Sequence, residues 1–193
     1  MVKVQPIRDL GHISRIKRNL RTPDTAVMYA LFVTGINTNL RISDLRALRW
    51  ADVWQENSRE FRSHIYLTEE KTDKPRRILI NEKVQEALTY LLQSLPRPPE
   101  AKDVIFRNPR TRKAYSREHL SRYMGEQARK VGIQDPIGAH SLRKTWGYQA
   151  VITFRQPLTI VQAAFNHASQ SETMGYLCIT DDEIETVHEM VSI

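Results

Sequence analysis

The sequence lacks several features that would assign it to whole classes of protein. It contains one cysteine, Cys178, so no disulfide can form within the chain, which fits a reducing cytoplasm. It has no apolar run long enough to span a bilayer. Its first residues, Met-Val-Lys-Val-Gln-Pro, lack the apolar core of a signal peptide. Internal repeats and low-complexity tracts are also missing, so we expect a soluble, cytoplasmic, globular protein without a membrane partner.

The length and composition are those of an ordinary folded domain. A chain of 193 residues fits one domain, with at most a short appendage, and is long enough to bury a core. The apolar share of 40% and the charged share of 26% argue against disorder. The densest proline cluster, residues 96–99, is typical of a local break rather than a linker between domains.

Positive charge is in excess. The chain has 29 Lys and Arg against 22 Asp and Glu, a formal net charge of +7 and a pI near 9.7. Such an excess favours a polyanionic partner, nucleic acid first and an acidic membrane surface second. A soluble protein that is simply basic is the plain alternative, and charge alone does not separate the two.

The hydrophobic periodicity predicts a mostly helical chain with one β-hairpin, an α+β class dominated by α-helix. Strands are predicted over 64–68 and 77–80, where apolar and polar side chains alternate, with a polar turn at 71–75 between them. Asn81 is expected to cap the helix that follows, and Thr180 to open the last helix with a capping box. The predicted helices cover 14–21, 23–35 with Thr22 as its N-cap, a segment starting near 43, 82–95, 116–131, segments after 141 and 159, and 180–191.

Six residues together suit the breaking of a phosphodiester bond without a metal or other cofactor. Arginines can hold a phosphate through paired hydrogen bonds, histidine moves protons near neutral pH, and a tyrosine hydroxyl can attack phosphorus. Each residue taken alone has a more ordinary interpretation: a surface arginine, a solvated lysine, a capping or hydrogen-bonded histidine, or a packed tyrosine. The six residues are Arg41, Lys71, His140, Arg143, His167 and Tyr176.

Their order and spacing resemble the tyrosine recombinases, the phage-integrase family, from about residue 22 to residue 184. Residues 40–45, Leu-Arg-Ile-Ser-Asp-Leu, resemble the family's first arginine box, and residues 140–145, His-Ser-Leu-Arg-Lys-Thr, its His-x-x-Arg box. Residues 165–176 resemble the final box, in which a histidine precedes the nucleophile by nine positions. Residues 70–72, Glu-Lys-Thr, resemble the lysine-bearing β-turn. Each box is moderately specific, and all four in order are strong.

The resemblance implies a tyrosine recombinase catalytic-domain fold and a role for each residue. It makes Tyr176 the nucleophile that forms a 3′-phosphotyrosyl link, and Arg41 and Arg143 the holders of the phosphate oxygens. His167 would add a hydrogen bond to the phosphate, Lys71 would protonate the leaving 5′ oxygen, and His140 would assist proton transfer. The expected function is site-specific recombination of double-stranded DNA, as an integrase or invertase. Two rivals stay open: a type IB topoisomerase, and a DNA-binding accessory factor without catalysis.

The sequence departs from the family pattern in three places. Asn166 stands before His167, where glycine is usual, and the turn at 36–39 is longer and poorer in glycine than in many relatives. Only a short basic extension, residues 1–21, precedes the catalytic domain, so the helical DNA-binding domain typical of relatives is expected to be absent. Either the chain is a small member of the family or it is the catalytic domain alone.

The resemblance also implies a homo-oligomer on DNA, a tetrameric synapse, from a protein that can be a monomer in solution. The segment 180–193 would then dock on a neighbouring subunit, although packing on its own domain is the simpler interpretation. A nucleoid-associated location in the cytoplasm follows from the expected function.

Overall fold

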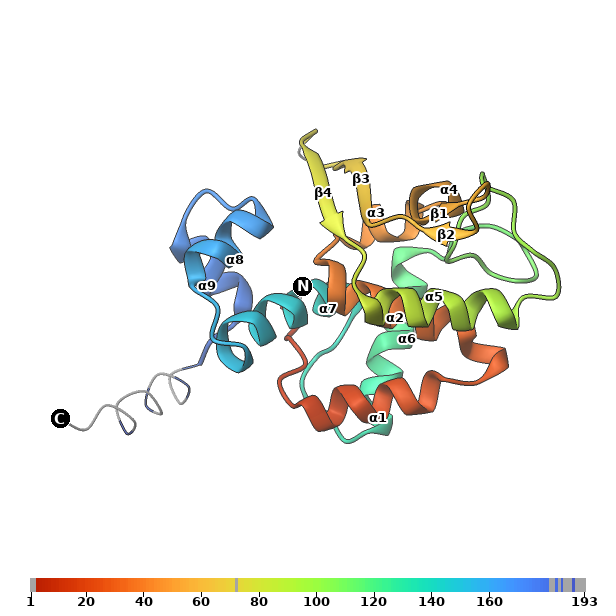
Figure 1. Cartoon of the computed structure of the whole chain (residues 1–193). Coiled ribbons are helices and arrows are strands. Elements are labelled where there is room, and N and C mark those ends of the chain that lie inside the picture. Colours follow the sequence, from red (N-terminus) through yellow and green to blue (C-terminus); the bar gives the residue numbers. More distant parts are fainter. Residues whose placement is uncertain (1–2, 72, 181–182, 184, 186–188, 190–193) are drawn as a thin grey trace.

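The computed structural model describes residues 3–71, 73–180, 183, 185 and 189. Helices dominate, as the sequence predicts, and the strands form two small antiparallel pairs where one hairpin was expected (Figure 1). The helices of the first half are α1 (Leu10–Leu20), the 3₁₀ turn η1 (Pro23–Thr25), α2 (Ala26–Thr38), α3 (Ile42–Ala47), α4 (Trp50–Val53) and α5 (Glu82–Ser94). Those of the second half are α6 (Arg117–Lys130), α7 (Ala139–Tyr148), the π-helical segment η2 (Gln149–Thr153), α8 (Leu158–Phe165) and α9 (Gln170–Leu177).

The predicted hairpin is present. Strands β3 (His64–Thr68) and β4 (Pro75–Leu79) pair antiparallel, with Ile65 opposite Ile78. A second pair, β1 (Trp54–Gln55) and β2 (Glu60–Phe61), was not predicted, because two residues per strand are too few to show alternation. Helix α4 was also not predicted, because its four residues are too few to show helical periodicity.

Helix α2 is the centre of the main core. It is apolar on nearly every face, as expected of a buried helix, and it packs between α5 and α7. The expected end near Gly35 is wrong, because the helix continues to Thr38. Gly35 does not end the helix but allows α2 and α7 to pack closely, because a Cβ there would lie 2.7 Å from a methyl group of Leu142 in α7. The left-handed residue that ends the helix is Asn39, at φ 49°.

The segment expected to be a basic extension belongs to the main core. Asp9 caps α1 through Gly11, so the helix begins four residues before the predicted start. Ile13, Ile16 and Leu20 of α1 are buried in the same cluster as α2. The preceding segment is tied to α7, where the amide of Ile7 donates to Thr145 at 2.8 Å.

A second, smaller cluster lies at the far end of α7. Val161, Phe165 and Leu177 are buried there, and α8 and α9 form a lobe around them (Figure 1). Helix α7 connects the two clusters, because it packs on α2 at one end and on α9 at the other. No helix in the described ranges combines the length and apolar character needed to cross a membrane.

Two predicted caps are present. Asn81 accepts a hydrogen bond from the amide of Val84 at 3.0 Å. Ser116, which was not predicted to cap, accepts one from the amide of His119 at 3.1 Å. Thr180 and Glu183 exchange the two hydrogen bonds of a capping box. The rest of the predicted last helix, through residue 191, lies largely outside the described residues.

Candidate active site

Two of the predicted arginines share one buried carboxylate. Arg41 stands in an extended conformation at the N-cap of α3, and its Nη1 lies 2.5 Å from Oε2 of Glu69. Arg143 comes from α7 and is only 3% exposed, with its Nη1 3.9 Å from Oε1 of the same glutamate. Glu69 follows β3 and is itself 1% exposed. One buried anion therefore holds two guanidiniums near each other, although their charges repel.

Two backbone carbonyls hold the guanidinium of Arg143 in place. Its Nη1 donates to the carbonyl of Asn39, and its Nη2 donates to that of Phe165 at 2.9 Å. The guanidinium lies over the Phe165 ring, 4.8 Å from its centroid. Burial lowers the pKa of Arg143 to about 10, so the side chain stays charged at neutral pH. It is a pre-organised, desolvated cation.

Tyr176 of α9 lies beside this cation. Its ring packs edge-on against Phe165 and His167, with centroids 5.3 and 5.2 Å apart. Burial raises the pKa of Tyr176, and the nearby charges of Arg143 and Arg41 offset part of that rise. The hydroxyl is therefore protonated at neutral pH and needs a proton acceptor before it can act as a nucleophile.

His167 is fixed in the turn between α8 and α9. Its Nδ1 lies 3.1 Å from Oγ1 of Thr173, a buried residue of α9. Burial lowers the pKa of His167, and the charges of Arg143 and Arg41 lower it further. The preceding Asn166 adopts φ 63°, which explains how asparagine stands where relatives use glycine: asparagine tolerates this left-handed conformation.

His140 and Lys71 are held less tightly than the other four. His140 lies in the first turn of α7 with its side chain exposed, and Lys71 is exposed in the turn after β3. Although His140 is exposed, the protein around its ring displaces water and lowers its pKa, and the charges of neighbouring cations lower it further: Arg117, Lys144, Arg143 and Lys71. His140 therefore faces the same cationic region as Arg143 and is neutral at pH 7.

Sequence reasoning missed the residues that support the arginines. Asn39 accepts from Nη2 of Arg76 through Oδ1 at 2.8 Å and donates through Nδ2 to the carbonyl of Ala164 at 3.1 Å. Arg76 of β4 also donates to Glu69 at 2.8 Å. A glutamate just before a turn lysine looks solvated in the sequence, so Glu69 left no signal. Asn39 did leave one, its tolerance of left-handed backbone in a predicted turn.

Asp44 links the first arginine box to the lysine turn. Its Oδ1 accepts a hydrogen bond from the amide of Glu70 at 3.1 Å, which ties α3 to the residue before Lys71. Burial raises the pKa of Asp44, although the Glu70 amide bond opposes this. Within the described ranges no group of three or more His, Cys, Asp or Glu side chains is placed to hold a metal ion.

The helical fold and this cluster define the class of a tyrosine recombinase catalytic domain. The sequence profile of the phage integrase family matches residues 9–183, and the chain therefore belongs to that family. A curated relative, the probable integrase/recombinase YoeC of Bacillus subtilis (strain 168), is 34% identical over 187 residues, which are 97% of this chain and 96% of that protein. The predicted class, a site-specific tyrosine recombinase, is confirmed at this level.

Solved structures share the fold at lower identity. XerA recombinase matches with a TM-score of 0.72 and 23% identity over 96% of this chain, and XerH bound to a palindromic difH substrate with 0.75 and 19% over 98%. A lambda integrase(75–356) dimer bound to a COC′ core site matches with 0.66 and 18% over 92%. The chain covers 63%, 53% and 60% of those three chains.

Proposed function

We propose that this protein cuts and rejoins double-stranded DNA at specific sites through a covalent phosphotyrosyl intermediate. The observation that carries the proposal is the position of Tyr176 beside the buried Arg143, which shares Glu69 with Arg41. A phosphate placed on two fixed guanidiniums would lie next to the tyrosine hydroxyl. Donors that need no rearrangement stabilise the charge that develops on the phosphate oxygens in the transition state.

The proposed reaction is a transesterification. The Tyr176 oxygen forms a bond to phosphorus as the bond from phosphorus to the 5′ oxygen breaks, which leaves a 3′-phosphotyrosyl link and a 5′ hydroxyl. The tyrosine proton goes to His140, and Lys71 donates a proton to the leaving oxygen. A 5′ hydroxyl from the partner strand then reverses the step, so bond energy is retained and no nucleotide cofactor is needed.

The histidines fit these roles through their protonation states. His140 has a lowered pKa, so it is neutral at pH 7 and can accept a proton. His167 is oriented by Thr173 next to the tyrosine ring and would donate a hydrogen bond to the phosphate from its other nitrogen. Tyr176, with its raised pKa, depends on such an acceptor.

A nicked suicide substrate, from which the short 5′ fragment diffuses away, tests the nucleophile. Wild-type protein should accumulate a covalent protein–DNA adduct, whereas Tyr176→Phe should bind the same DNA and give none. An equal yield of adduct from the two proteins would reject Tyr176. Binding without an adduct in both would favour the accessory-factor alternative. Relaxation of supercoiled plasmid without strand exchange between sites would favour the topoisomerase.

Assembly and location are further parts of the proposal. We infer a tetrameric synapse on DNA formed from a protein that is monomeric in solution, acting on the cytoplasmic nucleoid. The lobe of η2, α8 and α9 supports an assembly, since it exposes Phe154, Ile160 and Met174, which are 65%, 60% and 43% exposed. Comparing the mass in solution with and without DNA tests this, and an unchanged protomer number on DNA would contradict it.

A further inference from the structure

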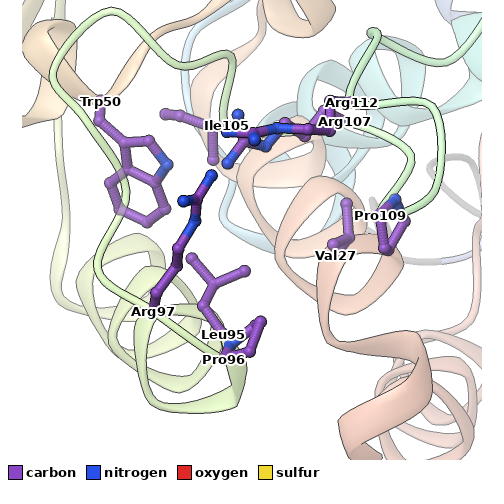
Figure 2. A pocket seen from close by; sticks show the side chains of 9 residues that line it. All are labelled: Val27, Trp50, Leu95, Pro96, Arg97, Ile105, Arg107, Pro109 and Arg112. Atoms are coloured by element: carbon purple, nitrogen blue, oxygen red, sulfur yellow. The ribbon is translucent and has the colours of Figure 1, made fainter.

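A second group of arginines converges far from the tyrosine. Arg97, Arg107 and Arg112 line a cavity of about 210 Å³, and Figure 2 shows the guanidinium of Arg97 pointing toward the other two. The other lining residues are apolar: Val27, Trp50, Leu95, Pro96, Ile105 and Pro109. We call this cavity the arginine pocket.

The backbone holds two of these arginines in place. Arg97 lies between Pro96 and Pro98, whose rings fix φ and limit how the segment can move. Arg112 adopts φ 58°, a conformation that costs free energy for a side chain of its size. A closed turn maintains it, because the Arg112 amide donates to the carbonyl of Asn108 at 2.8 Å. The backbone positions from which Arg97 and Arg112 project are therefore restricted, whereas their exposed side chains are held by no hydrogen bond or ion pair within the described residues.

The charges in the arginine pocket are poorly balanced. Arg107 pairs with Asp103 at 2.5 Å. Arg97 and Arg112 are exposed, as are the control arginines used below, and their guanidiniums have no hydrogen-bond or ion-pair partner among the residues that the structure describes. No carboxylate lines the pocket. Three like charges thus share one neighbouring carboxylate. An anion in the cavity would relieve this repulsion and satisfy several N–H donors at once.

The arginine pocket is separate from the catalytic cluster. Val27, in its wall, lies in the first turn of α2, whereas Asn39, which supports Arg143, ends the same helix. Twelve residues of helix separate them, which corresponds to roughly 18 Å along the axis. One phosphate cannot occupy the two places.

We propose that the arginine pocket binds a second phosphate group. Guanidiniums pair with phosphate oxygens through two parallel hydrogen bonds, and three of them can surround one such group. The cavity is smaller than the roughly 300 Å³ at which pockets for drug-sized ligands begin, so it fits a phosphate or diphosphate rather than a whole nucleotide. The phosphate belongs either to duplex DNA that continues past the cut site or to a free phosphorylated compound.

The test compares two double variants of the full chain that remove equal charge. Arg97→Gln/Arg112→Gln empties the pocket of two guanidiniums, whereas Arg59→Gln/Arg110→Gln removes two exposed arginines outside it, one of them in the same turn. Titration calorimetry with inorganic pyrophosphate measures the affinity of the pocket for a free phosphorylated compound. The affinities for a short duplex limited to the cut site and for a duplex extended at its ends are also compared. Their difference shows whether the pocket binds a phosphate of DNA beyond the cut site. Thermal unfolding shows that the four substitutions leave the fold intact.

If the proposal is right, the pocket variant loses about tenfold or more in affinity for pyrophosphate, for the extended duplex, or for each of them, relative to the control variant. A loss on the extended duplex alone identifies DNA as the source, and a loss on pyrophosphate alone identifies a free compound. Equal affinities of the two variants for every probe would overturn the proposal. Since the pyrophosphate titration needs no DNA cleavage, its result is independent of whether Tyr176 is the nucleophile.

Discussion

At the scale of single residues, the two arginines proposed to bind phosphate are held by side chains that have no role in the proposed reaction. Glu69 lies between Arg41, Arg76 and Arg143, and Asn39 bonds to Arg76 and Arg143. Guanidiniums this close repel one another, and a shared carboxylate reduces that repulsion. The arrangement of the cations thus follows from a buried anion, and it exists before any DNA arrives.

Replacing Glu69 by glutamine should slow cleavage and destabilise the fold. The amide keeps the shape but removes the charge, which leaves buried guanidiniums uncompensated at a cost of about 3 kcal/mol in unfolding free energy. We expect the covalent trapping rate at saturating DNA to fall about tenfold or more. Urea unfolding and single-turnover trapping measure the two effects. Glu70→Gln, at an exposed neighbouring position, is the matched control. Faster trapping by Glu69→Gln would mean that this carboxylate competes with the phosphate.

The histidines should make cleavage and stability depend on pH below neutrality. His140 and His167 have folded-state pKa values below their usual 6.5, so the unfolded chain binds protons more readily than the folded one. Stability conferred by the neutral rings is present above pH 6.5 and is lost as the pH falls through the folded-state pKa values. Urea unfolding between about pH 7.5 and about pH 5 should show a smaller loss for His140→Gln/His167→Gln than for wild type. Parallel curves would contradict the lowered pKa values.

The cleavage rate should follow the same protonation. A neutral His140 is needed to take the tyrosine proton, so trapping should decline on the acid side with an apparent pKa below 6.5. His140→Gln should lower the plateau and remove that acid limb. An acid limb that persists unchanged in this variant would assign the proton acceptor to another group.

At the scale of elements, α7 joins the two halves of the site by close packing. It carries His140 and Arg143 and lies against α2 and α9. Gly147 allows that approach, since a Cβ there would lie 2.6 Å from Cε2 of the Phe165 ring. The same ring supports Arg143 and Tyr176. The distance between α7 and α9, which carries Tyr176, therefore depends on the absence of a side chain at this position.

Gly147→Ala should move Phe165 and so disturb the site. Overpacking of this kind costs about 1–3 kcal/mol, and the shift of the ring should slow covalent trapping as well. Gly175→Ala is the control, because a Cβ at that position of α9 meets nothing within 4 Å. We expect Gly175→Ala to be neutral or slightly stabilising. Thermal unfolding and trapping rates compare the two variants. Equal melting temperatures and equal trapping rates would show that α7 can accept a side chain at residue 147 without displacing Phe165.

At the scale of the whole molecule, the excess of positive charge should govern DNA affinity. The net charge of +7 comes from basic segments along the chain, among them residues 15–18 on α1 and 129–130 at the C-terminal end of α6. Lysines and arginines that neutralise phosphates release counterions, so the affinity depends on salt.

We expect log K for DNA to fall linearly with log salt concentration. The slope is about −0.9 for each phosphate neutralised, and about six to ten such phosphates would reduce affinity roughly 10³- to 10⁵-fold between about 50 and 200 mM salt. Arg15→Gln/Arg18→Gln should make the slope less steep by about 0.9 for each phosphate that the variant no longer neutralises. Fluorescence anisotropy with labelled duplex measures this, and an unchanged slope would place α1 away from DNA.

The helical class, the β3–β4 hairpin and the caps at Asn81 and Thr180 were all predictable from the sequence, which also indicated the six candidate residues. These follow from local rules, since periodicity, capping residues and motif spacing are read along the chain. The predicted end of α2 at Gly35 is wrong, because this glycine makes room for Leu142 and does not end the helix. That distinction depends on a contact between residues far apart in sequence.

The contacts that hold the candidate site could not be predicted from the sequence. Glu69, Asn39 and Arg76 come from three separate segments, and nothing local marks a glutamate as buried between guanidiniums. The arginine pocket is likewise assembled from loops and helix ends that meet only in the fold. The physical reason is that burial and charge pairing are properties of the packed chain, whereas motif spacing is a property of the sequence.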